Sequence, residues 1–242
     1  MDNPIRLHWL DPRDPDQAFP PAHQAMRDPN GLLAIGGDLS VGRLIRAYSQ
    51  GIFPWYNPDE PILWWSPNPR AVLMPEEMRV SRSLGKSIRR ADYAVSLDQA
   101  FGEVVNHCSG PRTRSRGTWL GSDMQLHLKG YAHSVEVWRA GKLVGGLYGV
   151  ALGRVFFGES MFSLATDASK IALHWLCQQL MSWGFGLIDC QVGSAHLSSL
   201  GAREVSRERF LNLLREAIKA PPRTGQWCFD LPLPCARVHM SV

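Results

Sequence analysis

Periodic hydrophobic positions divide the first third of the chain into short elements. Residues 31–35 form an apolar run that predicts a strand, and Ser40 is placed to cap a helix that continues through Tyr48 and ends at Gly51. Residues 71–74 predict a further strand, and Ser81 is placed to cap a helix that continues to residue 90. This part of the chain is therefore expected to mix short strands and helices.

From residue 133 the pattern changes to that of an antiparallel meander. It predicts strands at 134–138, 143–150 and 155–158, then an apolar helix at 167–183, a strand at 185–192, a short helix at 194–200, a strand at 203–205 and a helix capped by Ser206. This order, β-β-β-α-β-α-β-α, is that of an N-acetyltransferase-like (GNAT-like) acyltransferase core. Prolines between residues 54 and 69 indicate a crossing between domains. The prediction is an α+β fold with a small N-terminal domain, 1–65, packed on an acyltransferase-like domain, 66–242.

Composition narrows the class of protein. The 242 residues are 45% hydrophobic, enough for a sizeable core, and contain no apolar run of transmembrane length and no signal-type N-terminus. The five cysteines show no CxxC spacing, which favours a reducing compartment and predicts a cytoplasmic location. The eight histidines show no metal-binding spacing, so no metal is expected. Because the net charge is only +4, a polyanionic partner requires a local basic patch.

An acid and an amide interrupt the otherwise apolar strand at 185–192. Side chains alternate along a strand, so Asp189 and Gln191 are expected on one face and Cys190 on the other. Two interpretations are open. Asp189 caps the turn that follows the strand, or it orients the Gln191 amide towards a polar group in a cleft. Apolar neighbours indicate that Cys190 is a core thiol.

The helix at 82–90 carries an uncompensated basic face. Four basic side chains share it: Arg82, Lys86, Arg89 and Arg90. Such a face is either simply solvated or an anion-binding footprint for a phosphate backbone. A second basic stretch, residues 112–116, precedes Trp119 and is compatible with contact to the end of an RNA.

Aromatic residues are dense between residues 51 and 69, including Trp55, Trp64 and Trp65. They pack two domains together, or some of them wall a pocket for an apolar group or a nucleobase. Residues 162–169 lack the glycines that a coenzyme A pyrophosphate loop needs and place Asp167 where the anion would bind. A small-molecule N-acetyltransferase is thereby disfavoured. A non-enzymatic RNA-binding module is a second candidate function.

Several long motifs occur in a fixed order along the chain. They include Gly-Ile-Phe-Pro-Trp at 51–55, Ile-Leu-Trp-Trp-Ser-Pro at 62–67, Gly-Glu-Ser-Met-Phe-Ser at 158–163 and Ile-Asp-Cys-Gln-Val at 188–192. In these motifs the chain resembles the leucyl/phenylalanyl-tRNA–protein transferase family. The resemblance implies transfer of Leu, and also Phe and Met, from aminoacyl-tRNA to the α-amino group of proteins with N-terminal Arg or Lys. It further implies that the modified proteins are marked for N-end-rule degradation.

The resemblance also implies roles for individual residues. Asp189 and Gln191 would be catalytic. Substrate-binding roles fall on Glu159, Trp55, Trp119 and Leu147, and tRNA-binding roles on Arg82, Lys86, Arg89 and Arg90. Leu147 departs from the family, which often has Met on this pocket floor. That difference bears on the order of preference among Leu, Phe and Met.

The chemistry implied needs no cofactor, because an aminoacyl ester is already activated and requires only positioning and proton transfer. The acceptor α-amine, with a usual pKa of about 8, must lose a proton before it attacks. Either Asp189 polarises Gln191, whose carbonyl accepts from the amine, or the pair only orients the amine while the terminal hydroxyl of the tRNA transfers the proton. The sequence leaves both routes open.

Overall fold

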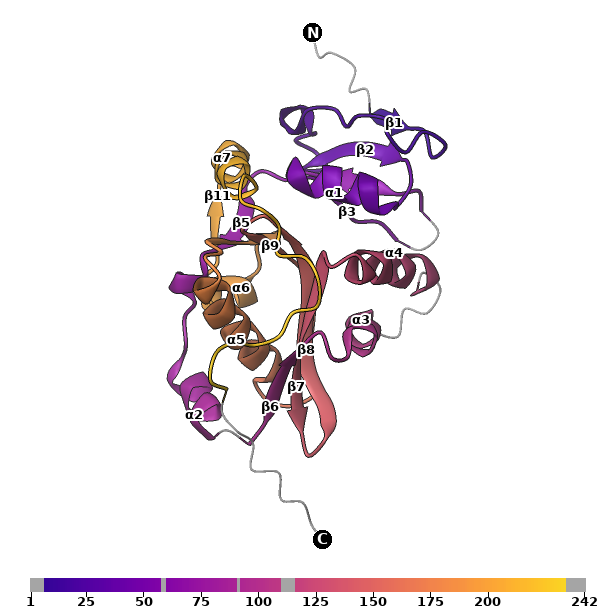
Figure 1. Cartoon of the computed structure of the whole chain (residues 1–242). Coiled ribbons are helices and arrows are strands. Elements are labelled where there is room, and N and C mark those ends of the chain that lie inside the picture. The colour runs from indigo at the N-terminus through magenta and orange to yellow at the C-terminus, as the bar shows by residue number, and fades with distance from the viewer. Residues whose placement is uncertain (1–6, 58–59, 91, 110–115, 234–242) are drawn as a thin grey trace.

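A computed structural model gives the structure of the chain and describes residues 7–57, 60–90, 92–109 and 116–233, with side chains from residue 121 onward in the last range. Two sheets organise it (Figure 1). A four-stranded sheet has the order β1-β2-β4-β3, and a seven-stranded sheet has the order β11-β5-β10-β9-β8-β7-β6. Within the described residues, no helix is long and apolar enough to cross a membrane.

The four-stranded sheet is built from the N-terminal quarter of the chain. Its strands are β1 (His8–Leu10), β2 (Leu32–Gly36), β3 (Phe53–Pro54) and β4 (Leu63–Trp65). The predicted strand at 31–35 is confirmed as β2. Helix α1 (Val41–Ser49) lies beside this sheet, and the Ser40 hydroxyl accepts the Arg43 N–H, so the predicted cap is also confirmed.

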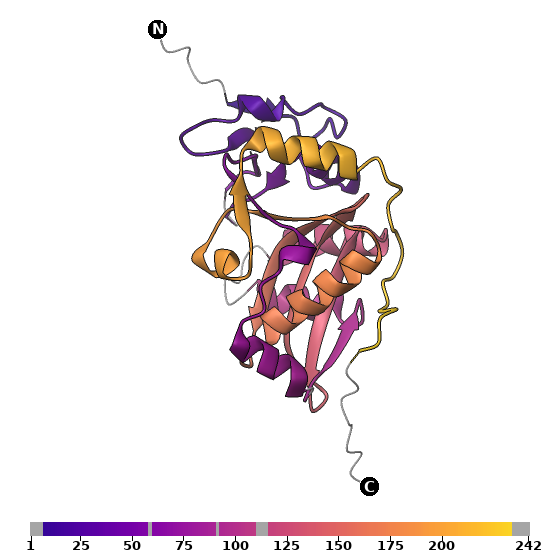
Figure 2. The same cartoon turned by 90° about the vertical axis from the view of Figure 1, so that its left-hand side faces the viewer.

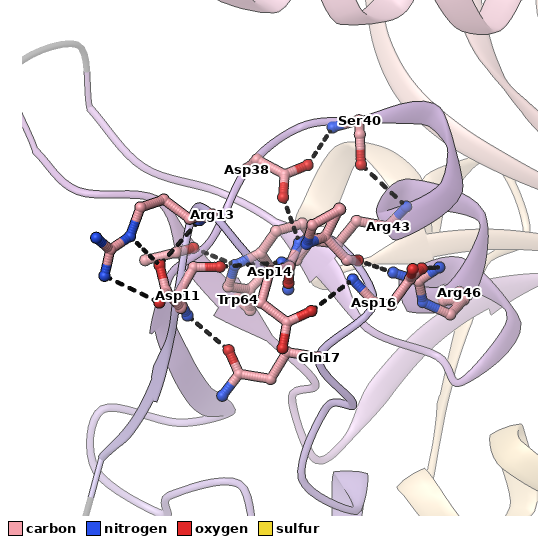
Figure 3. A network of polar contacts seen from close by, with 12 residues as sticks. Asp11, Arg13, Asp14, Asp16, Gln17, Asp38, Ser40, Arg43, Arg46 and Trp64 are labelled. Atoms are coloured by element: carbon pink, nitrogen blue, oxygen red, sulfur yellow. Dashed lines mark hydrogen bonds and ion pairs between the residues drawn. The ribbon is translucent and has the colours of Figure 1, made fainter.

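Arg43 of α1 fixes the irregular segment that follows β1 (Figure 3). Its side chain is buried; Nε donates to Asp38 Oδ2 at 2.9 Å, and Nη2 donates to the backbone oxygens of Asp11 and Asp14. A buried guanidinium needs several acceptors, and here backbone carbonyls of the loop supply two of them. The loop is therefore ordered by a side chain about thirty residues further along the chain.

The seven-stranded sheet is built from the rest of the chain. Its strands are β5 (Arg70–Leu73), β6 (Ala94–Leu97), β7 (Ala132–Arg139), β8 (Lys142–Leu152), β9 (Val155–Ser163), β10 (Leu187–Gln191) and β11 (Arg203–Val205). β7, β8 and β9 pair antiparallel, which confirms the predicted meander, and β10 pairs parallel to β9. β9 extends to Ser163, so Glu159 lies within this strand and not after it.

Helices cover both faces of this sheet (Figure 1). α5 (Ala168–Ser182) lies on one face, and α3 (Phe101–Cys108) and α4 (Arg116–Leu128) lie on the other. α2 (Arg82–Arg90) packs against α5, α6 (Ala195–Ser199) follows β10, and α7 (Arg207–Ala217) follows β11. Two short 3₁₀ turns complete the described elements, at Ala22–Gln24 and Pro75–Glu77. The sequence did not predict α3 or α4.

The element order from β7 to α7 is β-β-β-α-β-α-β-α, which confirms the predicted α+β, acyltransferase-like class. The division at residue 65 stays a prediction. One cluster of buried side chains joins the two sheets and includes Trp64, Val72, Phe157 and Phe210. α7 lies beside the N-terminal sheet in Figure 2. A Cβ atom at Gly51 would come within 3 Å of the Phe210 and Leu211 side chains of this helix.

Candidate active site

A cavity of about 320 Å³ opens beside the parallel strands β9 and β10. Most of its lining is apolar and includes Leu73, Leu147, Phe156, Leu173, Leu176 and Ile188. Glu159 and Gln191 bring polar groups to one part of this lining. An apolar space with a few converging polar groups is the usual form of a small-molecule site. The structure thus brings Leu147, Glu159 and Gln191 to one cavity.

Asp189 does not line this cavity but lies behind it in a buried ion pair with Arg70. Arg70 Nε donates to Oδ1 at 2.8 Å and Nη2 donates to Oδ2 at 2.6 Å, and the guanidinium packs over the rings of Phe53 and Phe210. Sequence reasoning missed Arg70. The signal was a charged residue at the start of an apolar strand, where burial requires a partner of opposite charge.

The predicted alternation of Asp189, Cys190 and Gln191 is wrong. A register irregularity falls between Asp189 and Gln191, and Gln191 has φ +61°. A bulge of this kind turns the following side chain to another side of the strand. Cys190 and Gln191 consequently line the cavity together, and Asp189 accepts the Gln191 backbone N–H at 3.0 Å. Through this hydrogen bond Asp189 caps the turn that follows the strand, which is one of the two interpretations of the sequence.

Cys190 is a poor nucleophile despite its place in the cavity wall. Burial raises the pKa of its thiol to about 12, and the nearby Asp189 charge acts in the same direction. At neutral pH the thiol is protonated, which agrees with its interpretation as a packing residue.

Glu159 of β9 connects the cavity to helix α1. Its Oε1 accepts the Tyr48 hydroxyl at 2.8 Å and the Gln191 Nε2 amide at 3.1 Å. Burial and the charge of Asp189 together raise the pKa of Glu159 to about 7, against the lowering effect of these hydrogen bonds and of Arg70. Sequence reasoning predicted the helix that holds Tyr48 but gave no signal that this hydroxyl reaches Glu159.

A second buried carboxyl group lies near Glu159. Asp123 of α4 is buried, and the pKa of its carboxyl is raised well above the usual value by burial and by Glu159. The Tyr148 hydroxyl opposes this shift by hydrogen bonding. Two carboxyl groups and two tyrosine hydroxyls therefore lie close together at this side of the cavity. The sequence did not single out Asp123 or Tyr148.

The aromatic residues noted in the sequence differ in burial and surroundings in the structure. Trp64 is buried, packs edge-on against Phe19 and donates its indole N–H to Gly36 O at 2.8 Å, so its role is structural. Trp55 is 61% exposed and lines a second hollow of about 210 Å³ together with Trp65 and Val192. This hollow and the cavity share the chain segment that follows β10. The side chain of Trp119, although its backbone belongs to α4, lies outside the described residues.

Helix α2 presents its basic side chains to solvent, as predicted from its amphipathic pattern. All four are exposed: Arg82, Lys86, Arg89 and Arg90. Of these, Arg90 forms the ion pair found among the described residues, with Asp92 at 2.8 Å. In the second basic stretch, residues 112–115 lie outside the described residues, and Arg116 begins α4.

Asp167 occupies the turn between β9 and α5 where a pyrophosphate loop would be required. Its carboxylate accepts the Ser87 hydroxyl at 2.9 Å and the Lys170 ammonium at 3.1 Å. A carboxylate at this helix terminus opposes an anionic ligand. No group of three potential metal ligands occurs in the part of the chain that the structure describes.

Comparison with known proteins decides the family. The model described as "Leucyl/phenylalanyl-tRNA protein transferase" matches residues 72–215, and that of its N-terminal domain matches residues 37–68. The chain belongs to this family. The resemblance seen in the sequence motifs is thereby confirmed, and the leucyl/phenylalanyl-tRNA protein transferase family is one of aminoacyltransferases.

Proteins named leucyl/phenylalanyl-tRNA–protein transferase are similar along almost the whole chain. The one from Nitrosospira multiformis is 58% identical over 229 residues, covering 93% of this chain and 97% of its own. That from Nitrosomonas europaea is 56% identical over 224 residues, covering 90% and 95%. Among solved structures, a GCN5-related N-acetyltransferase from Kribbella flavida covers 67% of this chain and 60% of its own, with a TM-score of 0.38 and 10% identity. That score is too low to bear on the fold, which rests on the element order.

Proposed function

We propose that the protein transfers Leu, and also Phe and Met, from aminoacyl-tRNA to the α-amino group of proteins that begin with Arg or Lys. This would mark them for N-end-rule degradation in the cytoplasm. The observation that supports the proposal best is an apolar cavity with Glu159 and Gln191 in its wall. The cavity suits an unbranched apolar side chain, and the polar groups suit the reacting ester and amine.

The donor is proposed to place its side chain against Leu147 and its terminal adenosine near Trp55 and Trp119. Trp55 supports this, because its exposed ring lies in the hollow that adjoins the segment after β10. Aromatic rings are sequence-tolerant partners for a nucleobase. In this arrangement the donor end lies between the proposed N-terminal domain, 1–65, and the acyltransferase-like domain, 66–242.

Gln191 and Asp189 are proposed to act on the reacting groups in different ways. The Gln191 amide N–H is engaged by Glu159, which leaves its carbonyl oxygen to accept from the attacking amine. Asp189 holds the Gln191 backbone through one hydrogen bond and therefore positions the amide. The terminal hydroxyl of the tRNA remains an alternative route for the proton.

The acceptor is proposed to be a peptide with a cationic N-terminal residue. Such a residue brings two positive charges, one on the α-amine and one on its side chain. The carboxyl groups of Asp123, which is buried, and of Glu159, which is partly buried, are close enough for each to affect the other, and positive charge nearby would stabilise their ionised forms. This favours Arg or Lys over a neutral N-terminal residue.

The direct test of the proposed function is transfer of labelled Leu from Leu-tRNA to a peptide that begins with Arg. A peptide that differs only in beginning with Ala is the control. We expect label on the Arg peptide alone, because the Ala peptide lacks the second positive charge. Equal labelling of both peptides, or of neither, would contradict the proposal.

Charge reversal on α2 is expected to weaken tRNA binding. Changing Arg82, Lys86 or Arg89 to Glu should lower the affinity, and each lost phosphate contact should reduce the slope of log affinity against log salt by about 0.9. The affinity for tRNA is measured over a range of salt concentrations.

Two controls separate a contact to tRNA from an effect on the fold. Arg215→Glu makes the same change on an exposed residue of α7, at the other end of the molecule from α2 (Figure 1), and should leave the salt slope unchanged. A short aminoacyl-adenosine analogue, which does not reach α2, should bind every variant equally. Loss of analogue binding would show that α2 has a structural role instead.

Leu147→Met is expected to shift donor preference towards Phe. Leu147 is buried in the cavity wall, and the longer, unbranched Met side chain adapts more readily to an aromatic ring. The ratio of kcat/KM for Phe-tRNA to that for Leu-tRNA should rise by up to about tenfold, because apolar pockets separate such side chains weakly. Ile-tRNA and Val-tRNA should remain poor donors.

Leu143→Met is the matched control for this substitution. Leu143 is a buried residue on the same strand, β8, but does not line the cavity. The donor ratio should not change in that variant. If Leu147→Met also leaves it unchanged, the pocket for the donor side chain lies elsewhere.

A further inference from the structure

Asp189 is poorly placed to take a proton from the acceptor amine. Its two carboxylate oxygens both accept from the Arg70 guanidinium, and Oδ1 also accepts the Gln191 backbone N–H. The side chain is fully buried and is not part of the cavity lining. Both oxygens of this carboxylate are therefore already engaged by donors within the protein.

Glu159 has the access that Asp189 lacks. It lines the cavity beside Gln191, and both of its hydrogen bonds, from Tyr48 and from Gln191 Nε2, are made to Oε1. The described residues give Oε2 no hydrogen bond. A base within reach of the amine needs a free lone pair of this kind.

We propose that Glu159 is the general base that takes the proton from the acceptor α-amine, and that Asp189 and Arg70 are positioning residues for Gln191. This inference rests on the proposed transfer of an aminoacyl group. Gln191 orients the amine through its side-chain carbonyl, and Glu159, hydrogen-bonded to the same amide, lies next to that amine.

The groups that face Glu159 set its protonation. They come from five elements and are Tyr48 of α1, Asp123 of α4, Tyr148 of β8, Asp189 of β10 and Arg70 of β5. Burial, with the nearby Asp189 charge, places the pKa of Glu159 at about 7, close to the acceptor amine at about 8. Proton transfer is efficient when the base titrates near the working pH.

The protons of the reaction are then accounted for. The acceptor ammonium loses one proton to Glu159, and the neutral nitrogen forms a bond to the ester carbonyl carbon. The bond from that carbon to the terminal ribose oxygen breaks, and the leaving oxygen takes a second proton from the former amine. Glu159 releases its proton to solvent. The products are an amide, a free tRNA hydroxyl and one proton.

The test measures single-turnover Leu transfer to an Arg peptide from about pH 5 to 9 in wild-type, E159Q, D189N and Q191A proteins. Because the ionised form of Glu159 is active, the wild-type rate should be lost as the pH falls through about 7. E159Q should transfer Leu more slowly by roughly 10²–10⁴-fold, and its plot of rate against pH should lack the inflection that Glu159 causes in the wild-type plot. Its affinity for tRNA should be normal. The inflection of the acceptor amine near 8 should remain in every variant.

D189N distinguishes a positioning residue from the base. Asp189 raises the pKa of Glu159 through its charge, so in D189N the inflection should remain but move to lower pH. Formate, a small carboxylate that fits a cavity of about 320 Å³, should partly restore the rate of E159A and not that of Q191A. The formate experiment uses E159A and Q191A, so its result does not depend on how E159Q folds.

The outcomes separate this inference from the proposed function. An E159Q protein that keeps the inflection or transfers at the wild-type rate overturns the inference alone, as does equal rescue of E159A and Q191A by formate. Loss of the inflection in D189N would assign the proton to Asp189 and also overturn it. Wild-type protein that transfers no Leu would overturn the proposed function and the inference together.

Discussion

Gln191→Ala is expected to lower the rate of Leu transfer by roughly 10²–10⁴-fold, with little change in tRNA affinity. The Gln191 amide donates to Glu159 and lies in the cavity wall, so its loss removes the group that orients the amine and one hydrogen bond to the base. No residue of α2 lines this cavity, so the basic side chains of that helix should bind tRNA as before. Single-turnover rates and tRNA affinity are measured on the same protein.

Asp189→Ala should lower the rate of Leu transfer by a similar factor, because it removes the hydrogen bond that holds the Gln191 backbone. Asp189→Asn, which keeps the shape, is compared with it, since Asp189→Ala also leaves Arg70 unpaired. Ser198→Ala is the control, because Ser198 is an exposed residue of α6 outside the cavity lining. Near-normal turnover of Gln191→Ala and Asp189→Ala would exclude both residues from the reaction.

Arg70→Met is expected to lower the free energy of unfolding by about 3–5 kcal/mol. Arg70 and Asp189 are both buried, and the substitution leaves the Asp189 carboxylate without its bidentate partner. The cost of an isolated buried charge is large in a medium of low polarity. The free energy of unfolding is measured by urea denaturation.

The double variant Arg70→Met/Asp189→Leu tests the cause of this effect. If the unpaired charge is responsible, the double variant should recover most of the lost stability, because apolar side chains of similar volume often replace a buried pair without cost. Arg203→Ala, which breaks an exposed pair with Glu77, should cost at most about 1 kcal/mol. Equal effects of Arg70→Met and Arg203→Ala would contradict the assignment of Arg70 as a buried structural charge.

Elements whose signals are local were predicted correctly. Ser40 and Ser206 cap α1 and α7 through hydrogen bonds to backbone N–H groups three residues ahead, and Ser194 does the same for α6. The meander and α2 follow directly from alternating and helical periodicity. α3 and α4 were missed, although α3 buries Phe101, Val104 and Val105.

The bulge after Asp189 shows where local reasoning fails. Strict alternation placed Cys190 away from Gln191, but the positive φ of Gln191 and the hydrogen bond from its N–H to Asp189 turn both side chains to the cavity. A pattern of residue types does not reveal an inserted residue in a strand, because the irregularity depends on pairing with β5. The motif at 188–192 nevertheless contains Cys190 and Gln191, which both line the cavity.

By itself, the sequence determined the family, the order of most elements, the basic face of α2 and the identity of three cavity residues, Leu147, Glu159 and Gln191. These follow from spacing and motifs within short segments. Only the tertiary structure decided that Arg70 neutralises Asp189, that Tyr48 donates to Glu159 and that Trp227 of the irregular tail stacks on His133. It also decided that the pKa of Glu159 is raised to about 7. Such properties depend on burial and on partners distant in the chain, because the energy of a charge is set by what surrounds it in space.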